Sequence, residues 1–458
     1  MKLKQLRDSL LKGDLGDFLS SEKNLQAPPS EIARILSSIH GEDVIAVFNA
    51  LPNNVQLSIF RYMDLLVQKK IISGVSKERA SKILNSLNSD DRIAFFASLR
   101  GHHLARYLDY LDETNKKSTH DYLGYPTQSV ARLINTNFAS LPLHMTVAEA
   151  GEYLRNNFKD VETINVAYIV DHDGKLVDDI PIKRLVLSDQ HKKMEDIMDG
   201  FCAKLHIEDG ADDAVDVFHL HGLDTLPVTT KDNTLLGIVT VDDVMKVAER
   251  RSTREMQRFG GSESLEYPYV KTPFFSLIQK RAGWLIILFV GEMLTATAMG
   301  YFEHEIAKAV VLALFVPLII SSGGNSGSQA ATLIIRALAV KELTIRDWWY
   351  VLRREFLSGI TLGLTLGAIG FLRITLWQKM GWYDYGPHWA LIGITIFFSL
   401  IGILIWGTLS GSMIPILLKS IKQDPAASSA PFVATLVDVT GLVIYFTIAA
   451  IILKGSLL

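Results

Sequence analysis

The sequence predicts a multidomain membrane protein with an all-α helical-repeat N-terminal domain, an α+β tandem-repeat domain, a connecting helix and a five-helix α transmembrane domain. The 458 residues are 48% hydrophobic and 21% charged, but the charges concentrate before about Lys280. Beyond it come uncharged stretches long enough to cross a bilayer as helix, which takes roughly 20 residues. The charged half contains short helical patterns, followed by a supersecondary unit that occurs twice.

We expect this division to place the helical repeats at residues 1–128, the tandem repeat at 129–248, the connecting helix and its linker at 249–280, and the transmembrane domain at 281–458. The N-terminus is basic but lacks the apolar core of a secretory signal, so the charged half is expected in the cytoplasm. The net charge of -3 argues against nucleic acid as a partner. The single cysteine excludes a disulfide within one chain.

Residues 31–111 repeat short amphipathic patterns such as SEIARILSSIH, KERASKILNSLN and DDRIAFFASLR. Apolar residues recur in each pattern at helical spacing, which predicts an all-helical, solenoid-like domain. Asp90 and Asp91 precede one of these helices, and carboxylates favour the N-cap and the first turn. His102 and His103 are adjacent and point to different helix faces, so they do not suggest a metal site.

Five segments of the second half are predicted to cross the membrane. They are residues 283–302, 309–335, 356–372, 389–418 and about 426–453. Basic residues gather in the links before the third and the fifth segments, which places these links on the inside. The N-terminus is then cytoplasmic and the C-terminus outside. Gly359, Gly363 and Gly367 recur at intervals of four, which predicts close packing of the third helix.

The second segment interrupts its own hydrophobicity with SSGGNSGSQAAT, residues 321–332. We expect the glycines to loosen the helix, and Asn325 and Gln329 to line a water-filled path, because lipid does not tolerate irregular polar backbone. The alternative is a helix kink whose polar groups satisfy one another.

The fifth segment contains a carboxylate, Asp438, among apolar residues. No strongly basic residue lies mid-span in any segment, and ionisable residues at this depth are functional by default. These points favour an ion pathway over a structural pair with a polar group of a neighbouring helix. Glu292 in the first segment is a second membrane acid, but no comparably polar stretch surrounds it.

A small-sided face surrounds this acid in the fifth segment. Pro431 has no N–H, so the carbonyl of Ala427 is expected to lose its helical partner. The face comprises Ala427, Pro431, Ala434, Asp438, Gly441 and Tyr445. Together with Asn325, Gln329 and Glu292, the pore-lining candidates in this segment are Pro431, Thr435 and Gly441.

Residues 166–187 and 225–247 share one plan of strand, polar turn, strand and helix start. This plan resembles a pair of CBS modules. In the second copy GIVTVDD matches the module pattern, and the resemblance implies that Thr240 and Asp243 contact the ribose and phosphates of a nucleotide such as ATP. The first copy departs from the pattern, with Asp178, Pro181 and Arg184 at the equivalent positions. A purely structural pair of modules is the alternative.

The order of these parts, together with GGNSGSQAATLIIRALAVKELTIRDWW and DPAASSAPFVATLVDVTGLVIYF, resembles the MgtE family of magnesium channels. The resemblance covers essentially the whole chain. It implies a homodimer in the plasma membrane, which is the inner membrane of a bacterium, with a pore between the subunits. It further implies that Asp438 binds hydrated Mg²⁺, that Ala434 contributes a backbone carbonyl, and that the cytoplasmic domains and the connecting helix gate the pore.

Two departures from the family pattern concern the filter and the gate. Ala430 and Ser328 stand where asparagine is frequent in the family. The contacts to the waters around the ion are therefore expected to differ, which affects the ion selectivity of the pore. The connecting helix, Asp242 to Arg258, carries bases where relatives have acids that help bind regulatory magnesium. The gating candidates are Asp242, Lys246, Arg250 and Arg254, and Arg251 is a further base. Because cationic side chains cannot ligate Mg²⁺, we predict weaker magnesium-dependent closure.

Other functions remain open at this point. One is a broader divalent cation transporter that takes cobalt or nickel, or a sodium-coupled carrier. Another is a membrane-anchored CBS sensor that conducts nothing, although an anchor does not require the polar residues of the second and fifth segments. No nucleophile–base pair or phosphate-binding loop suggests an enzyme. The expected partners are a second copy of the chain, membrane lipid and magnesium ions.

Overall fold

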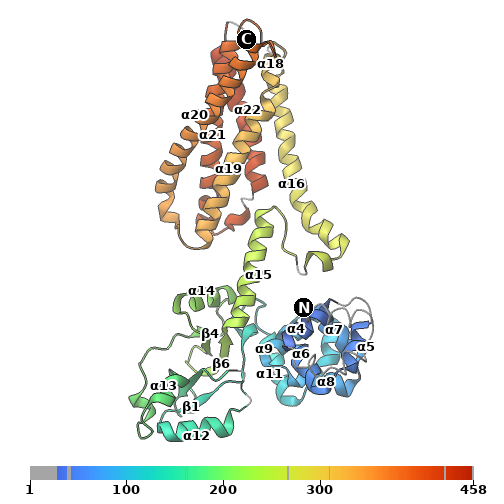
Figure 1. Cartoon of the computed structure of the whole chain (residues 1–458), viewed down its shortest axis with the longest axis vertical. Helices are drawn as coiled ribbons and strands as arrows, with labels where there is room; N and C mark the ends of the chain where they lie inside the picture. The colour runs from blue at the N-terminus through green and yellow to red at the C-terminus, as the bar shows by residue number, and fades with distance from the viewer. Residues whose placement is uncertain are drawn as a thin grey trace. The chain divides into compact units, whose positions relative to one another are not determined.

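The structure, a computed structural model, describes residues 28–38, 43–159, 161, 163–265, 268–308, 310–427 and 430–455 (Figure 1). The chain forms two compact units, Met1–Glu249 and Arg250–Leu458. Each unit is built around its own hydrophobic clusters.

The first unit begins with short helices, as the amphipathic repeats predict. They are α4 (Pro29–Ser37), α5 (Asp43–Ala50), α6 (Asn53–Phe60), α7 (Leu65–Gly74), α8 (Lys77–Ser86), α9 (Ser89–Ala97), α10 (Gly101–Leu108) and α11 (Glu113–Leu123). A chain of fully buried aromatic rings, Phe48, Phe60, Phe95 and Phe96, runs through their core. Asp90 and Asp91 lie in the first turn of α9, where their negative charges interact favourably with the helix dipole.

The repeated unit forms two three-stranded sheets of the same topology, so the predicted tandem repeat is confirmed. The strands are β1 (Ser140–Pro142), β2 (Val166–Val170) and β3 (Leu176–Pro181), then β4 (Leu205–His206), β5 (Thr225–Thr229) and β6 (Leu235–Thr240). In each sheet the first pair is parallel and the second antiparallel. Helices α12 (Val147–Asn157), α13 (Ile182–Leu187) and α14 (Ala211–His221) complete the two modules.

The two modules meet through buried contacts at their sheets. The hydroxyls of Tyr168 and Thr225 lie 2.9 Å apart, and the side-chain amide of Asn233 donates to the carbonyl of Leu176 at 2.6 Å. Because Tyr168 is almost fully buried, its pKa is raised well above the ordinary value for tyrosine. From the second module the chain continues directly into α15 (Val241–Phe259), the predicted connecting helix.

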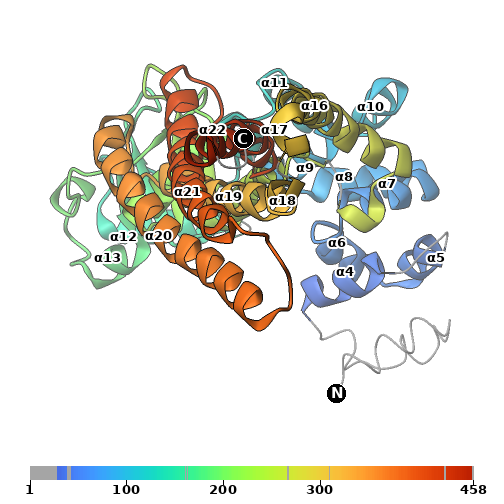
Figure 2. The same ribbon diagram turned by 90° about the horizontal axis from the view of Figure 1, so that it is seen from above.

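The second unit contains five helices long and apolar enough to span a membrane, which confirms the predicted five-helix domain. They are α16 (Phe274–Tyr301), α19 (Val316–Ala339) with the short α18 (Val310–Ala313) before it, α20 (Trp348–Met380), α21 (Trp389–Ser420) and α22 (Ala430–Leu453). The short α17 (Glu303–Lys308) follows α16. Seen from above, α21 packs between α20 on one side and α19 and α22 on the other (Figure 2).

The third span is longer than the sequence predicts. Its apolar stretch was expected at residues 356–372, but α20 runs through 33 residues. Its additional N-terminal turns carry aromatic and arginine side chains, which extend toward the membrane interface while the backbone stays helical. Its glycine ladder packs as predicted: a Cβ at Gly359 would lie 2.7 Å from the Cα of Ile405, and one at Gly363 would lie 2.6 Å from the Cα of Ile401.

The prediction that glycines loosen the second span is wrong, because α19 continues unbroken through them. They instead let α19 touch α21 backbone to backbone. A Cβ at Gly411 would lie 2.1 Å from the carbonyl oxygen of Gly327, and one at Gly407 would lie 2.6 Å from that of Gly323. The backbone of α19 therefore keeps its helical hydrogen bonds, and the glycines serve close packing between helices. This arrangement avoids the cost of an irregular backbone in lipid.

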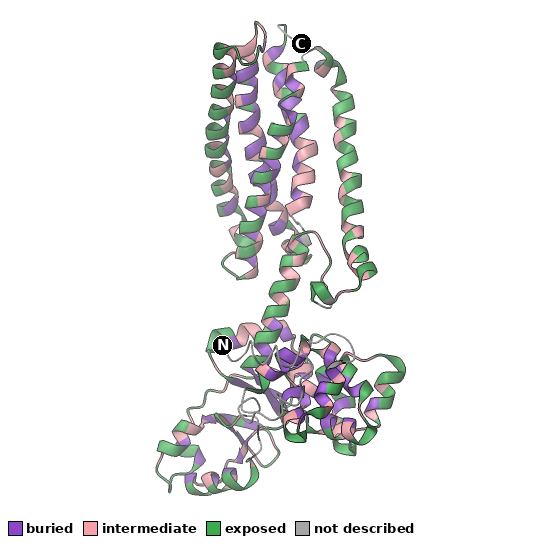
Figure 3. Ribbon diagram, turned by 45° about the vertical axis from the view of Figure 1, so that its right-hand side comes forward, coloured by how far each residue is buried: buried purple, intermediate pink, exposed green. Residues whose placement is uncertain are grey.

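Helix α16 differs from the other spans, because none of its residues is buried (Figure 3). Among the other spans, its main packing partner is α22. Phe302 at its end stacks on Phe446 with ring centroids 5.1 Å apart, and a Cβ at Gly291 would lie 3.0 Å from Cγ2 of Thr435. Most of its other exposed side chains are apolar, with Glu292 as an exposed acid within the span.

Candidate functional site

Asp438 lies half-buried on α22, opposite a glycine of α19. A Cβ at Gly324 would lie 3.5 Å from Oδ1 of Asp438 and 3.5 Å from Cβ of Ala434. The two helices run in opposite directions at this point, and no side chain of α19 fills the space beside the carboxylate at this glycine. Within the described part of the chain, Asp438 forms neither an ion pair nor a hydrogen bond.

The structure also brings the second membrane acid into this neighbourhood. Glu292 is exposed on α16, and its carboxylate lies close enough to Asp438 to repel it electrostatically. The sequence could not show this, because the two residues are far apart along the chain. Two acids in one electrostatic environment attract a cation more strongly than either does alone.

The predicted small-sided face of the fifth span is buried at its C-terminal end. Gly441 is buried against the side chain of Ile403. Tyr445 is buried, and its hydroxyl donates to the carbonyl of Leu312 at 2.9 Å. Both therefore serve packing against neighbouring helices. Between them and the helix start, Ala434, Thr435 and Asp438 are partly accessible.

The expected loss of a helical hydrogen bond at Pro431 does not occur. Because α22 begins at Ala430, Pro431 lies in the first turn, where a proline removes no helical hydrogen bond. Ala427 belongs to a separate short 3-10 helix, Pro425–Ala427, and does not share the helical face. The carbonyl of Ala430 instead accepts a hydrogen bond from the hydroxyl of Ser328 at 3.1 Å, which fixes the start of α22 to α19.

Asn325 and Gln329 are exposed on α19, one helical turn apart, and Ser321 continues the same stripe. The amide of Asn325 lies 3.5 Å from the hydroxyl of Ser321. Exposed amides at membrane depth require water or protein rather than lipid around them. We therefore expect this stripe to face water or protein rather than lipid.

A hydrogen bond that the sequence did not suggest attaches α22 to α21 on a different face from Asp438. The indole N–H of Trp406 on α21 donates to the hydroxyl of Thr440 at 2.6 Å. Thr440 is two residues from Asp438 and so points to another face of the helix. Together with the contact between Ser328 and Ala430, this hydrogen bond limits rotation of α22 about its axis.

In the second module, Thr240 and Asp243 come together as the sequence predicts. The hydroxyl of Thr240 lies 2.9 Å from Oδ2 of Asp243, and it lies 2.5 Å from Oδ1 of Asp242. Lys246 forms an ion pair with Asp243 at 2.8 Å. Burial alone would lower the pKa of Lys246, but the attraction and hydrogen bond of Asp243 outweigh it and raise that pKa above its ordinary value.

In the first module the equivalent residues support the fold. Asp178 is buried, and its carboxylate accepts backbone N–H groups of Asp199 and Gly200 at 3.1 and 3.0 Å. Arg184 pairs with Asp199 at 2.6 Å, and the hydrogen bond from this guanidinium lowers the pKa of Asp199. Pro181 ends β3 just before α13. These side chains are occupied by internal contacts.

The connecting helix carries its charges on accessible surfaces. Asp242 and Arg250 are exposed, and Arg254 is half-buried. Arg251 pairs with Glu255 along the helix at 3.2 Å, and Arg258 near the end of the helix pairs with Asp424. Because exposed ion pairs contribute only about 0.2 to 1 kcal/mol each, the helix is not held rigidly by any one of them.

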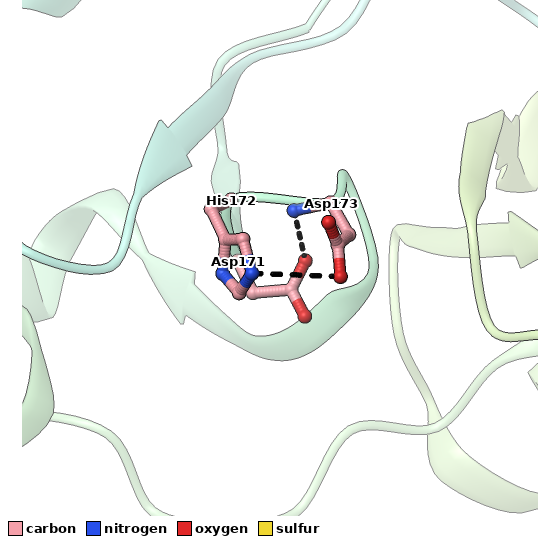
Figure 4. Close-up of side chains that lie close together, drawn as sticks. All are labelled: Asp171, His172 and Asp173. Atoms are coloured by element: carbon pink, nitrogen blue, oxygen red, sulfur yellow. Dashed lines mark hydrogen bonds and ion pairs between the residues drawn. The ribbon is translucent and has the colours of Figure 1, made fainter.

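One group of potential metal ligands lies in the turn between β2 and β3 (Figure 4). Oδ1 of Asp171 accepts the backbone N–H groups of Asp173 and Lys175 at 2.9 and 2.8 Å. His172 and Asp173 are exposed, with Nε2 and Oδ2 3.5 Å apart. The Asp171 carboxylate closes the turn, which is a common structural use of aspartate.

Comparison with known proteins follows the same division of the chain. Residues 316–448 match the MgtE family model, described as a divalent cation transporter. Residues 27–128 match the MgtE intracellular N domain, and residues 194–250 match the CBS domain. A crystal structure of the cytosolic domain of the Mg²⁺ channel MgtE in complex with ATP covers 54% of this chain and 99% of its own, with 23% identity and a TM-score of 0.49.

Curated relatives extend over nearly the full length. The magnesium transporter MgtE of Thermus thermophilus is 29% identical over 95% of this chain and 98% of its own length. The magnesium transporter MgtE of Bacillus subtilis is 27% identical over 96% of this chain and 95% of its own. Because family models match the N-terminal and the membrane part, and relatives align from end to end, the chain belongs to the MgtE family.

Proposed function

We propose that the protein transports magnesium ions across a membrane through a pore between two copies of the chain, with Asp438 of each copy at the filter. One observation carries the site assignment: a half-buried carboxylate at membrane depth has no partner among the described residues. Leaving such a charge uncompensated is costly, and a hydrated cation on the pathway compensates it. The magnesium transport of the related MgtE proteins supports the choice of ion.

The space beside Asp438 suits a hydrated dication. Mg²⁺ keeps several of its waters and is bound through one or two carboxylates. Gly324 and Ala434 leave room for those waters, and the backbone carbonyl of Ala434 is a further oxygen for them. Glu292 adds negative potential nearby. Binding through water is weak enough for the ion to leave again.

A second copy of the chain supplies the missing side of the pathway. The stripe of Ser321, Asn325 and Gln329 is exposed on α19, and its amides cannot face lipid. Two such stripes that face each other would enclose a polar path, with Thr435 and the first turn of α22 around Pro431 as further lining. The homodimer is therefore part of the proposal.

For the topology, we propose a multi-pass protein of the bacterial inner membrane with a cytoplasmic N-terminus. The basic links around Arg336 to Arg354 and at Lys419 and Lys422 support this orientation. The cytoplasmic part then comprises the helical repeats up to residue 128, the CBS pair up to residue 248, and the connecting helix and linker up to residue 280.

For the transport site, we expect Asp438→Asn to lower magnesium uptake by about tenfold or more, because the amide removes a charge that the dication shares, and 1.4 kcal/mol already corresponds to a factor of ten. Uptake is measured with the purified chain in lipid vesicles. Glu342→Gln, which changes an exposed acid between α19 and α20, is the matched control and keeps native uptake.

Unchanged uptake in a folded Asp438→Asn protein would exclude this residue from the filter. Competition by Co²⁺, Ni²⁺ or Na⁺ in the same vesicles separates magnesium selectivity from a broader divalent transporter or a sodium-coupled carrier.

For the gate, we expect native flux to fall only shallowly as magnesium rises on the side of the soluble domains, because Lys246 and Arg254 cannot ligate the ion. The double change Lys246→Glu with Arg254→Glu supplies carboxylates and should steepen this fall. The matched control, Lys246→Gln with Arg254→Gln, removes the same charges without adding ligands. A native protein that already closes steeply, or an acidic variant that behaves like the amide control, would contradict the proposal.

For the CBS pair, we propose ATP binding at the second module, with Thr240 and Asp243 on the ribose and phosphate side. Asp243→Asn should weaken ATP binding by about tenfold, since a hydrogen bond to a charged group contributes about 1.5 to 3 kcal/mol. Equilibrium dialysis with labelled ATP measures this, with Asp232→Asn in an exposed turn as control. Equal ATP affinity in both variants would favour a purely structural pair of modules.

A further inference from the structure

The chain after the connecting helix forms a folded turn rather than a loose linker. The backbone N–H of Ser262 donates to the carbonyl of Gln257 at 3.0 Å, and the side-chain oxygen of Gln257 accepts the N–H of Leu265 at 2.8 Å. Glu263 then pairs with Lys280 on α16 at 2.8 Å, and its N–H donates to the carbonyl of Lys280. The end of α15 is thereby tied to the beginning of the first span.

Gly261 lies at the centre of this turn, in a position that requires glycine. Its φ of +70° is in the left-handed region, which side chains with a Cβ rarely adopt. An added Cβ would also lie 2.6 Å from Cδ1 of Trp284 and 3.5 Å from Cγ of Pro431. The ring of Trp284 lies 6.3 Å from that of Phe432. The turn therefore packs through one indole ring onto the first turn of α22.

A second, independent contact joins the same two elements. Arg258, at the end of α15, forms an ion pair with Asp424, which precedes the short helix before α22. Both side chains are about half exposed, so their attraction is screened but remains directional.

We propose that Arg258 and the turn of residues 261–263 act as a joint that positions the first turn of α22, and through it the filter carboxylate. We call these residues the joint. From Pro431 to Asp438 is about two helical turns, and α22 is continuous between them. A shift of the first turn therefore carries Ala434 and Asp438 with it. Arg258, Gly261 and Trp284 are positioning residues and do not touch the ion.

This inference rests on the proposed transport of magnesium. The readout is the magnesium concentration at half-maximal flux, measured with the full chain in vesicles. This concentration does not depend on how much protein folds, so a merely structural role would leave it unchanged. If the native chain shows no saturable magnesium flux, the transport proposal fails; the joint is overturned only by the variants below.

The first arm tests the ion pair by charge reversal. Arg258→Glu should raise the half-maximal concentration by about two- to fivefold, the range that corresponds to an exposed ion pair. Asp424→Arg in the same chain should restore the native value, because the attraction is rebuilt with the charges exchanged. Lys231→Glu, which breaks the exposed pair of Lys231 with Glu208 in the second module, is the control and should change nothing. A reversal without effect, or a double variant no better than the single one, would overturn the joint.

The second arm tests the packed turn with neighbouring glycines. Gly261→Ala should raise the half-maximal concentration by about fivefold or more, because overpacking typically costs enough to displace the backbone. Gly260→Ala is the matched control, since its added Cβ would meet nothing closer than 3.5 Å. Equal effects of the two substitutions contradict the proposal. If Gly261→Ala does not fold, the charge-reversal arm still decides the question.

Discussion

The membrane unit depends on how closely α19 can approach α21 and α22. At Gly323 and Gly327 on α19, and at Gly407 and Gly411 on α21, the backbones touch with no space for a Cβ. In a bilayer, helices gain little from burying apolar surface, so this close van der Waals packing is what holds them together. It also places Gly324 directly opposite Asp438, and so determines the space in which an ion can meet the carboxylate.

In the soluble unit, a small group of polar contacts determines the state of the second CBS module. Lys246 pairs with Asp243, and the hydroxyl of Thr240 lies within hydrogen-bond distance of the carboxylates of Asp242 and Asp243, so internal contacts already involve both proposed nucleotide ligands. At the proposed nucleotide site, a ribose hydroxyl that donates to Asp243 would share this carboxylate with Lys246. Because Lys246 and Asp243 both belong to α15, this ion pair places the connecting helix directly at the proposed nucleotide site.

The sequence predicted the parts of the fold that depend on local pattern: the short amphipathic helices, the repeated strand pairs, the five spans and the glycine ladder of α20. It failed where distant segments decide the outcome. The glycines of α19 suggested a loosened helix, because the partner glycines of α21 that make close packing favourable cannot be identified from α19 alone. Pro431 suggested a broken hydrogen bond, because the pattern of the sequence does not show that α22 begins at Ala430, whose carbonyl accepts a hydrogen bond from Ser328 of α19. The proximity of Glu292 to Asp438 likewise results from the packing of two helices that are distant in the sequence.

Two glycines about one helical turn apart on α19, Gly324 and Gly327, offer the most direct test of where the ion binds. A Cβ at Gly324 would lie at an ordinary contact distance of 3.5 Å from Asp438, whereas one at Gly327 would lie 2.8 Å from Cγ1 of Val433 and 3.0 Å from the carbonyl oxygen of Gly407. Magnesium flux and thermal stability of both alanine variants are measured in parallel. We expect Gly324→Ala to keep native stability but to lose most of its flux, because the methyl group occupies space needed by the hydrated ion, and we expect Gly327→Ala to lose stability. Native flux in Gly324→Ala would contradict the central claim that the ion occupies the space beside Asp438.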